Sequence, residues 1–333
     1  MGKLEMKDMT EGKKHIMQNK NTSVIGVMLL LICAFVWGTT FVAQSTAADT
    51  MGPFTYLFSR SIIATVFLSI LVIIFDHMGK VTHRPENAEE KRNLRIGGFL
   101  CGVILCYASF FQQYGIAFTT AGKAGFITAF YIVMVPVLGI FLGKRPSKLL
   151  SISVLLALLG LYFLCMTGSF SLERGDTLVL LCALVFSFHI LTVDHFSPLV
   201  DGVRLSRNQF LVVTILSFIN MLLFEKPTVQ MILSGWFPIL YAGIMSSGIG
   251  YTFQILGQEK VNPTLASLLM SLESVFSAIS GAIVLGERMS GRELLGCILV
   301  FSAVILAQLP TRPKDSSMNL DMFRHKNHNI SEC

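Results

Sequence analysis

The stretch FQQYGIAFTTAGKAGFITAFYIVMVPVLGIFLGKRPS, residues Phe111–Ser147, has a second version late in the chain: FQILGQEKVNPTLASLLMSLESVFSAISGAIVLGERMS, residues Phe253–Ser290. Each version begins with Phe-Gln-x-x-Gly, continues through an apolar segment of helical length, and ends in Gly-x-Arg-x-Ser. A repeat of this length predicts a duplicated structural unit. Because both versions are apolar, we expect a unit built from membrane-crossing helices.

The composition supports a membrane protein. Of the 333 residues, 53% are hydrophobic and only 14% are charged, whereas soluble proteins carry about 25% charged residues. The sequence therefore predicts an all-α polytopic membrane protein. The net charge of +6 does not indicate a nucleic-acid partner, because the basic residues lie in short loops between apolar segments, as membrane topology requires.

The seven cysteines predict neither a disulfide framework nor a metal site. Six lie inside apolar segments, and none forms a Cys-x-x-Cys pair or a Cys/His cluster with metal-ligand spacing. We expect them to be small packing residues, and we expect no metal and no cofactor. Residues 1–23 are polar and lack a small-residue cleavage site, so they are interpreted as a cytoplasmic tail and not as a removable signal.

Ten apolar segments are long enough, at roughly 17–25 residues, to cross a bilayer as helices. They divide into a first five-helix repeat over residues 24–166 and a second over residues 177–309, followed by a polar tail over 310–333. The predicted spans are Val24–Ala43, Phe54–Phe75, Ile96–Phe118, Ala124–Leu142, Leu149–Met166, Thr177–Val193, Ser206–Phe224, Trp236–Gly257, Thr264–Leu285 and Arg292–Leu309.

The distribution of Lys and Arg predicts the orientation. If the N-terminus is cytoplasmic, twenty Lys and Arg residues fall in the inside segments and five in the outside loops. This bias follows the positive-inside rule. We therefore expect both termini to be cytoplasmic and the protein to lie in the cell membrane.

The repeat also relates the first helices of the two halves. Cys33-Ala34-Phe35-Val36-Trp37-Gly38 corresponds to Cys182-Ala183-Leu184-Val185-Phe186-Ser187, an offset of 149 positions. Since each half has an odd number of spans, the second half must enter the membrane from the opposite side. The predicted fold is therefore ten transmembrane helices in two inverted five-helix repeats. In such folds the substrate lies near the midplane between the halves, which rock to alternate access.

Several short motifs resemble one known family. They are Trp37-Gly38-Thr39, Ser59-Arg60, Gly143-Lys144-Arg145 and Gly286-Glu287-Arg288. With the ten-helix pattern, they make the chain similar to the drug/metabolite transporter superfamily, in the type with two EamA domains. The resemblance implies export of small metabolites, amino acids or drugs, without ATP and often with proton or gradient coupling. The chain departs from the family pattern at Lys144, where an acidic residue is usual, and at Ser274, where many relatives have proline.

Polar residues inside the spans are the candidates for binding a solute, because such groups must face a cavity or a neighbouring helix. In the first span, Trp37, Thr40 and Gln44 share one face with helical spacing. Gln112 and Gln254 occupy equivalent positions of the repeat, and Thr40 is equivalent to His189. Helix packing by the same residues is the alternative for each of them. The complete candidate set is Trp37, Thr40, Gln44, Gln112, Tyr131, His189, Tyr251 and Gln254.

Two charged residues lie deep within spans. Glu273 is the only carboxylate there, beside a stripe of small residues, and Arg60 is the only basic residue. We hypothesise that Glu273 couples transport to protons or binds a substrate amine. The alternative is a structural carboxylate that pairs with Arg60. Arg60 in turn either attracts a substrate carboxylate or pairs internally. The small-residue stripe suits internal packing or contact with a second copy of the chain as a homodimer.

The motifs exclude most other functional classes. The chain has no His-Glu-x-x-His, no Gly-x-Ser-x-Gly and no nucleotide-binding Gly-x-x-x-x-Gly-Lys loop, so neither an enzyme nor an ATP-driven pump is expected. Multiply anionic solutes need several cationic groups, and only Arg60 is available. We therefore favour a secondary transporter of a neutral or zwitterionic metabolite. The alternatives are an exporter of lipophilic cations and a receptor or scaffold without flux.

Overall fold

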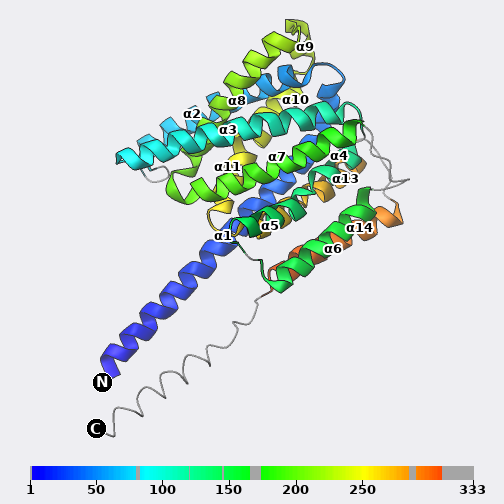
Figure 1. Cartoon of the computed structure of the whole chain (residues 1–333). Coiled ribbons are helices and arrows are strands. Elements are labelled where there is room, and N and C mark those ends of the chain that lie inside the picture. The colour runs from blue at the N-terminus through cyan, green and yellow to red at the C-terminus, as the bar shows by residue number, and fades with distance from the viewer. Residues whose placement is uncertain are drawn as a thin grey trace.

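A computed structural model describes residues 2–79, 83–119, 121–144, 146–165, 174–284 and 290–309. These residues form helices and their connections, without a strand among them. The protein is therefore an all-helical membrane protein, and Figure 1 shows its helices as a bundle from which the start of α1 extends. The predicted polar tail over residues 310–333 lies outside the described residues.

The described helices follow one another in this order: α1 (Gly2–Ala48), α2 (Pro53–Met78), α3 (Ala88–Ile116), α4 (Ala121–Thr128), α5 (Tyr131–Phe141), α6 (Lys148–Cys165), α7 (Arg174–Phe196), η1 (Ser197–Leu199), α8 (Gly202–Phe224), α9 (Val229–Ser234), α10 (Trp236–Tyr241), η2 (Ala242–Gly250), α11 (Tyr251–Gln258), α12 (Pro263–Met270), α13 (Glu273–Val284) and α14 (Gly291–Ala307). Here η1 is a 3-10 turn and η2 is a π-helix.

Seven of the spans in the described residues are long and apolar enough to cross a membrane. They correspond to the first, second, third, sixth, seventh, eighth and ninth predicted spans. The fourth predicted span divides into α4 and α5, while α6 and α14 are shorter apolar helices. The count of ten therefore stays a prediction. The helix α1 also continues through residues 2–23, which the sequence analysis treats as a tail.

Two spans are interrupted by turns. Ala129 and Phe130 separate α4 from α5, and Ser271 and Leu272 separate α12 from α13. The offset of 142 positions that relates Gln112 to Gln254 also relates the first turn to the second. A long apolar segment without proline at the break gives no local signal for such turns. The sequence predicts a continuous helix for the ninth span, and in the fourth span it predicts a kink only at Pro136, which lies inside α5.

The packing of the helices follows the same correspondence. The predicted second and seventh spans, α2 and α8, pack on each other, and so do the fifth and tenth, α6 and α14. Other main contacts also occur in pairs that the repeat relates. The packing of α3 on α7 corresponds to that of α1 on η2 and α11. The packing of α1 on α13 corresponds to that of α7 on α4 and α5. The outer surfaces carry exposed apolar side chains such as Ile70, Leu155 and Leu222, as lipid-facing helices do.

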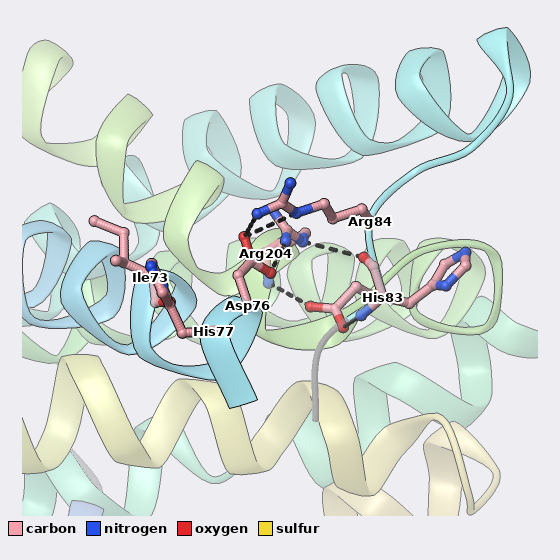
Figure 2. Close-up of polar contacts among 7 residues, drawn as sticks. Ile73, Asp76, His77, His83, Arg84 and Arg204 are labelled. Atoms are coloured by element: carbon pink, nitrogen blue, oxygen red, sulfur yellow. Dashed lines mark hydrogen bonds and ion pairs between the residues drawn. The ribbon is translucent and has the colours of Figure 1, made fainter. Parts of the chain in front are cut away.

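Acidic residues connect α2 and α8 at both ends. Glu225, which follows α8, accepts hydrogen bonds from the backbone of Phe54 and Thr55 at the start of α2, each at 2.8 Å. At the opposite end, Asp76 of α2 pairs with Arg204 in the first turn of α8. Figure 2 shows this cluster, in which Arg84 also reaches Asp76 at 3.1 Å. Carboxylates at helix N-termini are stabilising, so these contacts hold the two helices in register.

Gly38 allows α1 to approach α13 closely. A Cβ atom at this position would lie 2.5 Å from the Cβ of Phe276 and 2.7 Å from the carbonyl oxygen of Glu273. The backbones of the two helices therefore meet without an intervening side chain.

We predict that Gly38→Ala lowers the melting temperature of the purified protein by several degrees, because overpacking at a close contact costs about 1–3 kcal/mol. The matched control is Gly291→Ala, where no atom lies within 4 Å of the added Cβ. Equal melting temperatures for the two variants would contradict the close contact between α1 and α13.

Candidate functional site

A small buried cavity lies between the helices of the two halves. It has a volume of about 20 Å³, which is room for roughly one water molecule. Its walls come from α1, α2, α3, α4, α5, α7, η2, α11 and α13. The lining residues are Trp37, Thr40, Phe41, Gln44, Arg60, Gln112, Thr128, Tyr131, Phe186, Ile190, Ser246, Tyr251, Gln254 and Glu273.

A carboxylate and a phenol meet where the two interrupted spans resume. Glu273 is the first residue of α13 and Tyr131 is the first residue of α5. The Tyr131 hydroxyl donates a hydrogen bond of 2.8 Å to Oε1 of Glu273, and both side chains are buried. The two residues are related by the 142-position offset, so the bond joins equivalent positions of the two halves. No other hydrogen bond or ion pair of Glu273 is found among the described side chains.

Three glutamines form an amide cluster on one side of the cavity. Nε2 of Gln44 donates to Oε1 of Gln112 at 3.2 Å and to Oε1 of Gln113 at 3.4 Å. Gln113 donates in return to the backbone oxygen of Gln44 at 3.1 Å, and Gln112 reaches the hydroxyl of Thr128 at 3.5 Å. These bonds tie α1 to α3 and to the end of α4. Because an amide can both donate and accept, the cluster can exchange these partners for polar groups of a solute.

Aromatic rings form another part of the cavity wall, in which Trp37 and Tyr251 take part. The rings of Trp37 and Tyr251 lie 4.6 Å apart between centroids, and Phe210 packs edge-on against Tyr251 at 5.4 Å. His189 lies behind this wall, 6.0 Å from the Tyr251 ring, with Nε2 at 3.1 Å from Oε1 of Gln209. These rings give the cavity an apolar surface in addition to the amides.

Several buried polar atoms in the cavity wall have no hydrogen-bond partner among the described residues. They include both amide atoms of Gln254, Nε1 of Trp37 and Nε of Arg60. A buried group without a partner costs about 1–3 kcal/mol, so each of these atoms is prepared to bond with a ligand or a water molecule.

Arg60 is buried, with 3% of its surface exposed, and its guanidinium lies 5.4 Å from the centre of the Tyr56 ring. Among the described residues it forms no ion pair, so the predicted alternative of an Arg60–Glu273 pair does not occur there. The cavity wall thus contains one cationic and one acidic side chain that do not neutralise each other directly.

The structure brings nine of the ten candidate residues to one cavity. Only His189 does not line the cavity; its ring packs against Tyr251, which does line it. The sequence analysis missed Thr128, Ile190 and Ser246, which also line the cavity. No signal in the sequence distinguishes these residues from other small or apolar residues in the spans. The functional roles of all these residues stay predictions.

The described residues contain no group of three His, Cys, Asp or Glu side chains that could hold a metal ion. The cavity wall supplies hydrogen-bonding groups, two charged groups and aromatic faces. Such a site can recognise a solute, but in this conformation it is too small to hold one. Helices or side chains must move before a solute larger than water can enter.

Comparison with known proteins gives a consistent family assignment. The profile described as "EamA-like transporter family" matches residues 24–166 and 173–309. A protein of Archaeoglobus fulgidus described as an uncharacterized transporter is 28% identical over 281 residues, which is 84% of each chain. An uncharacterized transporter of Bacillus subtilis, YrdR, is 26% identical over 171 residues, covering 48% of this chain and 49% of that protein.

A solved crystal structure has the same fold. It superposes with a TM-score of 0.70 over 89% of this chain and 99% of that chain, at 20% sequence identity. At this identity the similarity bears on the fold alone.

We predict that Tyr131→Phe destabilises the protein by about 1–3 kcal/mol, because it leaves the buried Glu273 carboxyl without its hydroxyl donor. Thermal unfolding of the purified protein measures the effect. The matched control is Tyr107→Phe, whose side chain is on an exposed surface. In a double-mutant cycle with Glu273→Ala, the changes in the free energy of unfolding should not add, because the two side chains interact. Additive changes would exclude the interaction.

Proposed function

This chain belongs to the EamA-like transporter family, and we propose that it is a secondary transporter that exports a small neutral or zwitterionic metabolite. The observation that carries the proposal is the closed cavity in which Glu273 and Arg60 are both buried without pairing with each other. A zwitterion would place its ammonium group at Glu273 and its carboxylate at Arg60. An excess of cationic groups, which a multiply anionic solute would need, is absent from the described cavity wall.

The polar groups without partners support the same solute class. Gln254 offers a donor and an acceptor, and Trp37 offers a donor. A solute of amino-acid size would satisfy these atoms and rest its apolar part on the Trp37 and Tyr251 rings. Binding then recovers the cost of the unsatisfied groups, and this recovery favours solutes that carry hydrogen-bonding groups.

We further propose that ten spans form two inverted repeats around this cavity. Three observations support the arrangement: the interrupted spans fall at equivalent positions, the helix contacts occur in related pairs, and the family profile matches twice. Transporters of this architecture bind solutes at discontinuous helices. Here α5 and α13 begin with Tyr131 and Glu273, so rocking of one half against the other would strain or break that hydrogen bond.

The loop charges support the proposed orientation. We propose that both termini are cytoplasmic, on the basis of the Lys and Arg bias, and that the membrane is the cell membrane. We also propose that Glu273 takes up and releases the coupling proton, because a carboxyl group held by one hydroxyl inside a membrane is chemically suited to that role.

One observation favours a second candidate, an exporter of lipophilic cations. The aromatic wall and Glu273 together could hold a cation by cation–π and charge contacts. Arg60 argues against it, because a buried guanidinium in the same cavity repels a cationic solute. Solute-dependent flux would exclude a receptor or scaffold that does not transport.

The direct test is flux in proteoliposomes with a panel of zwitterions, neutral metabolites and lipophilic cations. We expect flux of a zwitterion, and we expect Glu273→Gln and Arg60→Gln each to reduce it at least tenfold, since each removes one charge contact worth roughly 1.5–3 kcal/mol. The matched control, Arg292→Gln, removes a guanidinium that lies over the rings of Tyr162 and Phe163 outside the cavity. Flux of cations alone would make the second candidate the function.

A pH gradient across the same liposomes tests the coupling. We predict that the gradient accelerates flux by the parent protein, and that residual flux by Glu273→Gln is independent of the gradient, because the amide cannot bind and release the proton. Asp49→Asn is the control, since it neutralises an exposed carboxylate at the end of α1. Retention of the full gradient response by Glu273→Gln would exclude Glu273 as the coupling group.

A further inference from the structure

A second pocket lies where the interrupted helices reach one end of the bundle. It has a volume of about 530 Å³, which is within the range of small-molecule sites. We call it the vestibule. Its lining residues are Lys144, Pro146, Ser147, Leu150, Asp194, Asn262, Pro263, Thr264, Leu265, Ala307 and Leu309.

The vestibule and the central cavity share their supporting helices. On α7, Phe186 and Ile190 line the cavity, and Asp194, one turn or ~6 Å further along, lines the vestibule. Likewise α5 begins at Tyr131, which lines the cavity, and ends at Phe141, three residues before Lys144, which lines the vestibule. Between the two spaces, α5, α7 and α12 pack against one another. The vestibule is therefore aligned with the cavity along these helices.

An ion pair forms between two residues that line the vestibule. Nζ of Lys144, beyond the end of α5, pairs with Oδ2 of Asp194 in the last turn of α7. The Asp194 side chain is 13% exposed and that of Lys144 is 45% exposed. A pair that solvent reaches on one side is weak enough to open and close without a large barrier.

The pair exists on one side of the repeat only. By the 149-position offset Asp194 corresponds to Ser45, and by the alignment of the two Gly-x-Arg-x-Ser motifs Lys144 corresponds to Glu287. The equivalent positions of the other half therefore carry a hydroxyl and a carboxylate, which cannot form this ion pair. An ion pair between these two positions can therefore hold one end of the protein closed, but not the equivalent end.

From this asymmetry we propose that the vestibule is the entrance for the solute at the Lys144 end, and that the Lys144–Asp194 ion pair is the gate between the vestibule and the cavity. The inference rests on the proposed transport function. The vestibule lining offers one ammonium and one carboxylate together with the apolar side chains of Leu150, Leu265 and Leu309. A small zwitterion carries a charge opposite to each of the two side chains. When it binds, it can therefore pair with both Lys144 and Asp194 in place of their contact with each other, and so open the gate.

The test measures how fast a water-soluble thiol reagent reaches the cavity. Ile190→Cys, 2% exposed in the parent, is introduced into the full chain in nanodiscs, and its labelling is followed by mass spectrometry so that native cysteines are distinguished. We expect Lys144→Gln and Asp194→Asn each to raise the labelling rate of Cys at position 190 by about two- to fivefold, the range for loss of a partly exposed ion pair. The charge swap Lys144→Asp with Asp194→Lys should return the rate towards that of the parent.

Two controls separate the gate from general loosening. Lys260→Gln disrupts a neighbouring ion pair with Glu259, 3.5 Å in length, and should leave the rate unchanged. Ala307→Cys reports from the vestibule side of the gate, so its labelling should be the same in every variant. Labelling at position 190 that is equal in the parent and both neutralised variants would overturn the gate, and so would a charge swap that labels as fast as the single variants.

The readout needs no solute, so it distinguishes the two proposals. If the neutralised variants label at the parent rate while the liposomes show flux, the gate is wrong and the transport function stands. If they label faster while no member of the panel is transported, the gate stands and the proposed solute class is wrong.

Discussion

The structure depends on one constraint: a polar group at membrane depth must find its partner inside the protein, because lipid offers none. The Tyr131–Glu273 hydrogen bond and the glutamine cluster around Gln44 meet this requirement at the centre of the bundle. The exposed surface is apolar at positions such as Ile70 and Leu222. The polar interior and the apolar exterior therefore both follow from the surrounding lipid, and buried atoms without a partner, among them those of Gln254 and Trp37, line the cavity.

Duplication explains why the polar groups meet there. Equivalent turns interrupt the spans after Thr128 and after Met270, and each turn starts a new helix whose first side chain, Tyr131 or Glu273, faces the other half. Backbone groups at such turns are tolerated at membrane depth only where protein or a cavity surrounds them. Interrupted helices therefore concentrate both polar side chains and freed backbone groups at the interface of the repeats, which makes that interface suited to a solute site.

The two halves differ in chemistry at equivalent positions of the repeat. Tyr131 and Glu273 are equivalent in position but not in chemistry, and so are Lys144 and Glu287. A symmetric pair of carboxylates at the centre would repel each other, whereas a phenol and a carboxyl bond. At the vestibule, Lys144 stands where the other half has Glu287, and it forms an ion pair with Asp194. The proposed gate rests on this difference between the two ends of the protein.

The sequence by itself determined the all-helical membrane class and most helix boundaries, because long apolar segments have few other stable forms. It also selected Gln112, Gln254 and Glu273, since a polar residue inside such a segment is conspicuous. Only the tertiary structure decided that Glu273 bonds Tyr131 instead of Arg60, that His189 lies behind the aromatic wall, and that Thr128 and Ser246 line the cavity. Partner choice depends on distances between helices that are far apart in the chain, and periodicity within one helix carries no information about those distances.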